Sequence, residues 1–104
     1  MNVQELMRQA KRMQKQMETA RAEAEAQTVE GSAGGGMVVV TANGKGEILS
    51  VKIEKEVVDP EEIEMLQDLV LAATNQAVGR AQELMGEAMS KVTGGMGLPF
   101  GNMF

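Results

Sequence analysis

Apolar side chains recur at alternating steps of three and four residues along the first part of the chain. Glycine and proline are absent from this stretch, and good helix formers such as Ala, Gln, Glu, Lys and Arg fill the other positions. The spacing is typical of the heptad seam of a coiled coil. It predicts a long helix over residues 3–26, about 36 Å in length at 1.5 Å per residue. The seam consists of Val3, Leu6, Ala10, Met13, Met17, Ala20 and Ala24.

The following stretch changes to the two-residue period of β-strands. Met37–Ala42 is apolar and β-branched, and in Glu47–Glu54 apolar residues alternate with polar ones, which predicts a half-buried antiparallel strand. Asn43-Gly44 lies between them and is typical of a two-residue hairpin turn, in which both central residues need positive φ. Gln27–Ala33 is a candidate for a further strand. We therefore expect a small antiparallel sheet made of a β-hairpin and a third strand.

A second long helix is predicted to begin at Asp59-Pro60-Glu61-Glu62. Asp59 can cap it, Pro60 suits the first helical position, and Glu62 can complete a capping box. The helix is expected over residues 60–92, with Gly94-Gly95 ending it. Its apolar seam has a mean step of about 3.7 residues, which favours globular packing, and a second apolar set on another face indicates partners on two sides. The seam is Leu66, Val70, Ala73, Ala77, Ala81, Leu84, Ala88 and Val92, and the second set is Leu71, Val78, Met85 and Met89.

These elements predict one α+β domain over residues 1–93, with the sheet in residues 27–55, followed by a Gly-rich flexible tail over residues 94–104. Strands of this length span about 20–27 Å, so helices of about 36 and 50 Å extend beyond the sheet. A chain of 104 residues has too little volume to cover both seams. We therefore expect a homodimer. The candidates for its interface or for the core are Leu6, Met13, Met17, Val38, Val40, Leu66, Val70 and Ala77.

The composition excludes several kinds of chemistry. The chain has no His, Cys, Trp or Tyr, and its two Phe residues lie in the last five positions. Cys and His nucleophiles, zinc sites of the usual ligand type, disulfides and stacking platforms for single-stranded bases are therefore absent. No apolar run is long enough to span a membrane, and no signal-peptide core begins the chain. We expect a soluble, cytoplasmic protein that is not an enzyme, with no cofactor, small-molecule substrate or membrane partner.

Two further motifs have a structural explanation. Gly31 and Gly34-Gly35-Gly36 suggest a phosphate-binding loop, but the Lys-Ser/Thr pair of such a loop is missing, and a strand follows instead of a helix. We expect these glycines to allow a bend or the close approach of another backbone. An acidic group could hold a cation such as Mg²⁺, but acids in a first helical turn also suit the helix dipole, so no metal is expected. This group consists of Glu61, Glu62, Glu64 and Asp68.

Charge is unevenly distributed along a chain whose net charge is −5. Residues 8–15 contain four cations and no anion, and all four lie on the face of the first helix opposite the seam: Arg8, Lys11, Arg12 and Lys15. Such a strip can contact phosphates, and a dimer would double it. The alternative is a solvated helix face, since Glu18 and Glu25 continue the same face with the opposite sign. These two acids can also neutralise Arg21, which is the weaker candidate.

A succession of short motifs runs through nearly the whole chain. They are Met7-x-x-x-Lys11-x-Met13-Gln14, Glu30-Gly31-x-Ala33-Gly34-Gly35-Gly36, Val38-x-Val40-x-x-Asn43-Gly44, Val51-x-Ile53 and the helix start at Asp59. In this order they resemble the YbaB/EbfC family of bacterial nucleoid-associated proteins. The chain departs from the family pattern in its tail, where Phe100 replaces a common Gly. The resemblance implies a homodimer of α-β-β-β-α protomers whose long helices project like tweezers. It also implies binding to duplex DNA with little sequence preference.

The sequence therefore leads to two hypotheses. In the first, a nucleoid-associated homodimer binds DNA phosphates through Arg8, Lys11, Arg12 and Lys15, with Arg21 as a weaker contact, and influences nucleoid organisation and gene expression. In the second, a dimeric adaptor or chaperone-like protein binds other proteins through its apolar, Met-rich helix faces. The two hypotheses differ in which face of the first helix matters.

Overall fold

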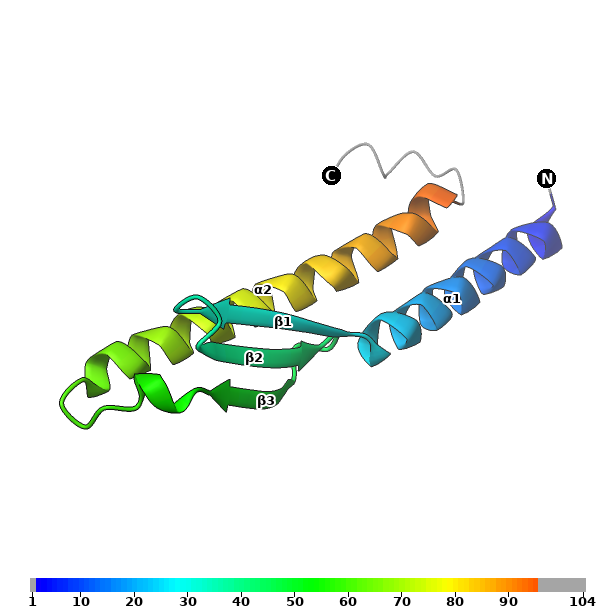
Figure 1. Ribbon diagram of the computed structural model, residues 1–104. Coiled ribbons are helices and arrows are strands. Elements are labelled where there is room, and N and C mark those ends of the chain that lie inside the picture. Colours follow the sequence, from blue (N-terminus) through cyan, green and yellow to red (C-terminus); the bar gives the residue numbers. More distant parts are fainter. Residues whose placement is uncertain (1, 96–104) are drawn as a thin grey trace.

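The computed structural model describes residues 2–95, in which two long helices flank a three-stranded antiparallel sheet along the chain (Figure 1). This is the predicted α-β-β-β-α order, and the third strand is present. The predicted tail begins inside the last helix, and residues 96–104 lie outside the described part. The elements are α1 (Val3–Ala26), β1 (Thr28–Ala33), β2 (Val38–Asn43), β3 (Ile48–Ile53), the short 3₁₀ helix η1 (Lys55–Val57) and α2 (Ile63–Gly95).

The first helix has the predicted bounds because its start, its period and its end are all encoded locally. Asn2 is in an extended conformation, and its Oδ1 accepts a hydrogen bond from the Glu5 N–H at 2.8 Å, which caps one of the free donors of the first turn. At the other end, Gln27 is extended and its N–H donates to the Ala24 carbonyl. The chain then passes directly into β1.

The three strands pair in sequence order, with β2 in the centre. Gly31 of β1, Val40 of β2 and Val51 of β3 are register partners and therefore share one face of the sheet. The helix α2 packs on this face, against β1 and β2. Burial alternates along β2, where Val38, Val40 and Ala42 are buried against the helix.

The core is purely aliphatic and thin. Ala73 and Ala77 of α2 meet the buried face of β2, and half-buried aliphatic side chains surround them. Every residue of the predicted α2 seam is buried or half-buried, which agrees with the 3.7-residue period. The cluster consists of Val38, Val40, Ala42, Ala73 and Ala77, with Val29, Ala33, Val57, Leu66, Leu69 and Val70 around it.

A backbone contact at Gly31 fixes the distance between helix and sheet. A Cβ atom at this position would collide with the Ala73 carbonyl oxygen and the Ala77 nitrogen of α2. Two hydrogen bonds tie the same strand to the same helix: the Ser32 N–H donates to Gln76 Oε1 at 2.7 Å, and Arg80 Nη1 donates to the Glu30 carbonyl at 2.6 Å. The expectation that Gly31 allows close approach of another backbone is confirmed.

The glycines after β1 serve a turn. Gly34, Gly35 and Gly36 all have positive φ, between 64° and 92°, a region that other residues rarely adopt. The Met37 N–H donates to the Gly34 carbonyl, and the chain enters β2 at Val38. The bend expected here is confirmed.

The predicted two-residue turn at Asn43-Gly44 is wrong. Asn43 ends β2, and a four-residue loop, residues 44–47, follows in which only Gly46 has positive φ, at 87°. The Asn43 side chain organises the loop, because its Oδ1 accepts from the N–H groups of Lys45 and Glu47. Gly44 is needed for another reason, since a Cβ atom there would collide with the Ala24 carbonyl at the end of α1.

The second helix begins later than expected and continues past Val92. Asp59–Glu62 form a turn in which the Glu62 N–H donates to the Asp59 carbonyl and the Glu61 N–H donates to Asp59 Oδ1. Asp59 thus caps this turn, and α2 starts at Ile63 instead of at residue 60. At the other end, Gly94 and Gly95 are the last described residues of α2, so the helix includes both glycines.

The burial predicted for the third strand is also wrong within the protomer. All six residues of β3 are exposed, because α2 covers β1 and β2 and does not extend over the edge of the sheet. The strand carries a bulge as well: Thr41 pairs with Ser50 and Ala42 with Ile48, which leaves Leu49 without a partner on β2.

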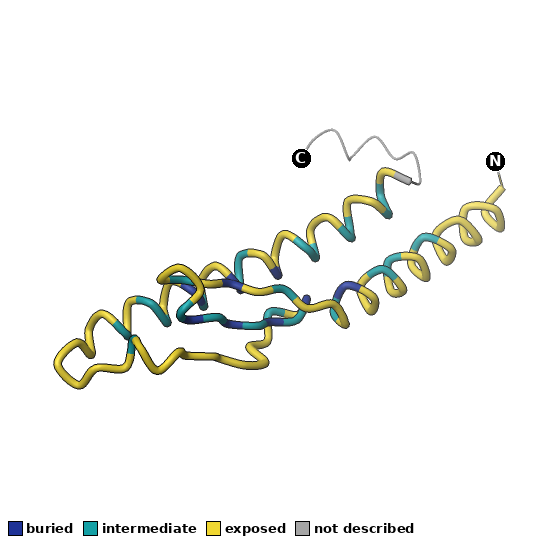
Figure 2. The backbone as a smooth tube through the Cα atoms, in the orientation of Figure 1, coloured by how far each residue is buried: buried dark blue, intermediate teal, exposed yellow. Residues whose placement is uncertain are grey.

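The described chain is long and narrow, with extents of 71 × 24 × 16 Å. Figure 2 shows buried residues only where α2, β1, β2 and the end of α1 meet, with exposed residues toward the ends of the helices. Among residues 2–95, no helix is both long enough and apolar enough to cross a membrane.

Replacing Gly31 with Ala should lower the free energy of unfolding by about 2 kcal/mol, because the added methyl group forces α2 away from β1. The matched control is Gly86→Ala, at a helical position with open space around it, which should raise stability by about 0.5–1 kcal/mol. Urea denaturation followed by circular dichroism measures both. Equal stability of Gly31→Ala and the wild type would contradict this account of the helix–sheet contact.

Candidate nucleic-acid interface

The four clustered cations form one strip on α1. Arg8, Lys11, Arg12 and Lys15 have the spacing i, i+3, i+4, i+7, which places them on a single helix face, about 10 Å from first to last. All four side chains are exposed. We call this set the cationic strip. It has the residue types and the exposure that phosphate contacts require.

The opposite face of α1 determines where the cationic strip points. Met13, Met17 and Ala20 are half-buried and Ala24 is buried, on the side where α1 runs antiparallel to the C-terminal half of α2. Because the strip is turned away from this contact, the body of the protomer does not cover it. The opposition of seam and strip that the periodicity predicts is present in the structure.

Arg21 is not part of the cationic strip. It lines a shallow hollow with Glu25, Lys45 and Glu47 beside the loop between β2 and β3. Arg21 also flanks Met17 and Glu18 on α1 itself. The nearby carboxylates make this a mixed surface, with less attraction for an anion than the strip has. The position of Arg21 depends on how the hairpin loop packs beside α1, which the helix period alone does not predict.

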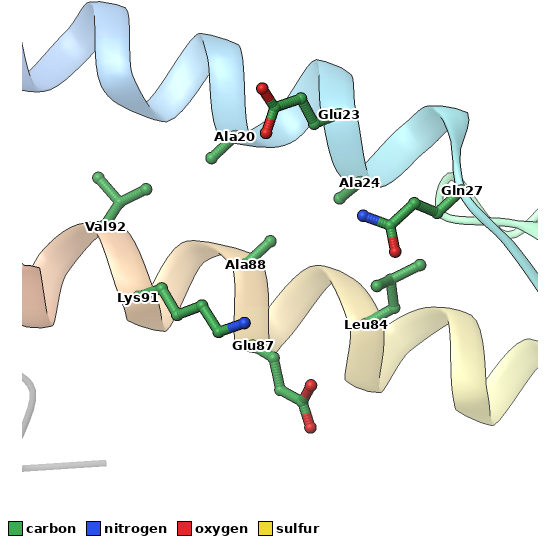
Figure 3. A pocket seen from close by; sticks show the side chains of 9 residues that line it. All are labelled: Ala20, Glu23, Ala24, Gln27, Leu84, Glu87, Ala88, Lys91 and Val92. Carbon is green, nitrogen blue, oxygen red and sulfur yellow. The ribbon is translucent and has the colours of Figure 1, made fainter.

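A groove of about 460 Å³ separates α1 from α2. Figure 3 shows Ala20 facing Ala88 and Ala24 facing Leu84 across it, with Glu87 pointing away. Small apolar side chains form its walls, and Glu23, Gln27 and Lys91 stand at its edges. This lining provides no nucleophile with an adjacent base. Within the described residues, no group of three or more acidic side chains could hold a metal ion.

The residues predicted for the interface or the core occupy three environments. Val38, Val40 and Ala77 are buried in the core, and Leu66 and Val70 pack around it. Met13 and Met17 are half-buried along α1. Leu6 is 48% exposed near the start of that helix.

The sequence did not reveal the open apolar surface of β3. Ile48, Val51 and Ile53 pair with Ala42, Val40 and Val38, so they lie on the helix-covered side of the sheet, yet they are 41%, 47% and 39% exposed. The alternation of apolar and polar residues predicts that Val51 and Ile53 face inward. It does not predict this for Ile48, because the bulge shifts the alternation before Ser50. Whether these inward-facing residues are covered depends on how far α2 extends across the sheet, and the sequence of β3 itself does not indicate this.

Comparison with known proteins shows the family of the chain. The sequence model of the YbaB/EbfC DNA-binding family matches residues 1–96. The chain belongs to the YbaB/EbfC DNA-binding family. A nucleoid-associated protein of Bacillus thuringiensis (strain Al Hakam) is 56% identical over 103 residues, which cover 99% of this chain and 94% of the relative. A nucleoid-associated protein of Clostridium novyi (strain NT) is 54% identical over 99 residues, which cover 95% and 87%.

The YbaB/EbfC resemblance inferred from the motifs is thus confirmed. A crystal structure of an uncharacterized protein from Helicobacter pylori has the same fold, with a TM-score of 0.71 at 24% identity. The match covers 84% of this chain and 91% of the other. The α-β-β-β-α order is therefore shared with a solved structure.

Removing the Asn2 cap should loosen the helix that carries the cationic strip. In Asn2→Ala the Glu5 N–H loses its acceptor, a change that costs about 1 kcal/mol and speeds amide exchange of residues 7–12 about fivefold. Asn2→Ser, which keeps a side-chain oxygen acceptor, should exchange at nearly the wild-type rate. Hydrogen exchange followed by NMR measures both. Equal exchange in the Ala and Ser variants would show that the cap does not hold this turn.

Proposed function

We propose that this YbaB/EbfC member is a nucleoid-associated protein that binds duplex DNA as a homodimer, mainly through phosphates and with little sequence preference. The observation that carries the proposal is the cationic strip, four exposed cations on the face of α1 that points away from the body. Membership in a DNA-binding family supports DNA as the anionic partner. The names of the relatives support a location on the nucleoid. Bound there, the protein would influence nucleoid organisation and gene expression.

The excess of acidic residues does not prevent this binding. Residues 28–104 hold 5 basic and 11 acidic side chains, so most of the negative charge lies outside α1. The centre of the strip is about 23 Å along the helix from Gln27, whereas the Debye length at physiological salt is about 8 Å. Only Glu5 and Glu18 flank the strip on α1, so residues 5–18 sum to 4 − 2 = +2. DNA that approaches α1 therefore meets a locally positive surface.

The composition of the strip favours phosphate contacts over base readout. Lys and Arg supply the charge, and no aromatic side chain lies in α1 to stack on a base. The strip is about 10 Å long. The phosphates of one DNA strand repeat every 3.4 Å along the duplex axis, so the strip can lie beside about three of them. Contacts of this kind carry no sequence information, so we expect little preference among DNA sequences.

The edge of the sheet supports a homodimer. Strand β3 is an edge strand whose outer backbone edge pairs with no other strand among residues 2–95, and its apolar side chains on the α2 side are exposed. Antiparallel pairing of β3 with β3 of a second copy would extend the sheet to six strands and place both α2 helices on one face. Ile48, Val51 and Ile53 would then lie between the two helices, removed from water. The dimer would carry 2 × 4 = 8 cations on its two strips.

Reversing three charges of the strip should abolish DNA binding. In Lys11→Glu/Arg12→Glu/Lys15→Glu, attraction becomes repulsion at the contact, and affinity for random duplex DNA should fall at least about 100-fold in a gel-shift assay. For the wild-type dimer, in which each strip contacts about three phosphates and the two strips together about 2 × 3 = 6, log K against log salt should have a slope of about −5. Circular dichroism and sedimentation should show unchanged helicity and mass.

The matched control makes the same change in net charge elsewhere. Lys45→Glu/Lys55→Glu/Lys91→Glu alters three exposed cations outside α1 and should bind DNA within a few-fold of the wild type. Equal loss in both triple variants would mean that only net charge matters. Undiminished DNA binding by the α1 variant would contradict the proposed contact. If Leu6→Ser then abolished binding to a protein partner, the adaptor hypothesis would be favoured.

A single substitution on β3 should separate the two protomers. Val51→Lys places a charge on the exposed apolar side of the strand, so the sedimentation mass should drop from 2 × 11.1 = 22.2 kDa to 11.1 kDa. Ser50→Lys is the matched control on the neighbouring residue, which faces the other side of the sheet, and it should remain dimeric. A monomeric wild type, or a dimeric Val51→Lys variant, would contradict the proposed interface.

A further inference from the structure

The outer edge of β1 carries backbone groups that point away from the sheet. The Gly44 N–H donates to the Gln27 carbonyl, which shows the side on which β1 bonds to β2. Because the direction of these groups alternates along a strand, the N–H and C=O groups of Thr28, Glu30 and Ser32 point outward. Among residues 2–95, no strand pairs with this side of β1. Such a row of groups is a template on which a strand of another chain can pair.

Two side chains of α2 occupy the middle of this edge. Gln76 Oε1 accepts a hydrogen bond from the Ser32 N–H at 2.7 Å, and Arg80 Nη1 donates to the Glu30 carbonyl at 2.6 Å. The two backbone groups that they bind are successive outward-pointing groups of β1, one on either side of Gly31. A strand that paired with β1 would use both groups. It would therefore have to displace both side chains of α2.

The position of α2 explains why these side chains reach the edge. Gly31 has no Cβ atom, so the backbone of α2 lies directly on β1 at Ala73 and Ala77. One face of the helix therefore extends past the outer side of this strand. Gln76 and Arg80 are four residues apart and lie one turn from each other on that face. The same close contact that forms the core thus places an acceptor and a donor beside the edge.

The opposite edge of the sheet, formed by β3, lies beyond the reach of α2. The helix packs against β1 and β2, and all six residues of β3 are exposed. This difference between the edges matters for assembly. Copies with two open edges can join β3 to β3 and β1 to β1 in turn, and repeating both contacts gives an open-ended sheet of many chains. Copies with one closed edge stop at a dimer.

We propose that Gln76 and Arg80 close the β1 edge to strands of other copies, so that strand pairing is restricted to β3 and assembly stops at two chains. The stop at two chains rests on the homodimer proposed above, whereas the closure of β1 does not. The same hydrogen bonds also hold β1 to α2. The two roles differ in their consequences, because loss of a helix–strand contact lowers stability, whereas an opened edge raises the mass of the assembly.

Shortening both side chains should open the edge. In Gln76→Ala/Arg80→Ala two backbone groups of β1 lose their partners, so the sedimentation mass should at least double, from 2 × 11.1 = 22.2 kDa to 4 × 11.1 = 44.4 kDa or more. Each single variant should grow in the same way at higher protein concentration. The matched control, Gln82→Ala/Lys91→Ala, removes one amide and one cation from exposed positions of α2 beside the hairpin loop and α1, and should keep the wild-type mass. Variants of Gln76 and Arg80 that keep the wild-type mass at every concentration would overturn the proposal.

A proline on β1 distinguishes strand pairing from misfolding. Ser32→Pro removes an N–H that points outward, so it costs no hydrogen bond between β1 and β2, and its ring obstructs pairing at this edge. Added to Gln76→Ala/Arg80→Ala, it should return the mass to that of the wild type. A triple variant that stays large would overturn the proposal, because the growth would then not arise from pairing at β1.

A monomeric background separates this proposal from the proposed dimer. In Val51→Lys, expected at 11.1 kDa, the changes Gln76→Ala/Arg80→Ala should give particles of 2 × 11.1 = 22.2 kDa through the β1 edge alone. A wild type that is itself monomeric would contradict the β3 interface, yet Gln76→Ala/Arg80→Ala should still double its mass. The absence of any increase in the Val51→Lys background would overturn the closure of β1, whatever the state of the wild type.

Discussion

The contact between the backbones of β1 and α2 is the constraint on which the rest of the structure depends. Gly31 has no Cβ atom, and Ala73 and Ala77 present the smallest side chains that a helix can carry without losing its propensity. The helix therefore lies directly on the sheet, and hydrogen bonds from Ser32 and Arg80 fix its position along the strand. Since α1 leads straight into β1, the same contact determines where α1 leaves the body.

Close approach of small residues also makes the protomer thin. Its smallest extent is 16 Å, so a single layer of side chains separates helix from sheet. The protomer therefore has too few residues to cover the ends of its helices and the edge of its sheet. The exposed side of β3 and the exposed start of α1 are two results of this shortage. The first is the surface at which we propose that a second copy packs.

The features that depend on neighbouring residues could be predicted from the sequence, whereas those that depend on packing between distant elements could not. The bounds of α1 follow from an Asn cap and an unbroken period, and the orientation of the cationic strip follows from the same period. The turn after β2 was misassigned because Asn43 acts through its side chain and Gly44 is needed for clearance from Ala24, so positive φ falls on Gly46. The exposure of β3 and the position of Arg21 depend on packing between elements far apart in sequence, which no local pattern reports.

The net negative charge strengthens the argument for one defined DNA contact. A protein with cations spread over its whole surface would bind a polyanion in many orientations. Here the acidic body repels DNA, and the strip on α1 offers an approach that is locally positive and more than a Debye length from most of the acids. In the proposed complex, repulsion elsewhere would therefore select the orientation, as like charges do at other specific interfaces. Binding through α1 would hold the body away from the duplex, and in a dimer the two strips would contact DNA while the rest of each protomer, which carries most of the acidic residues, stays outside it.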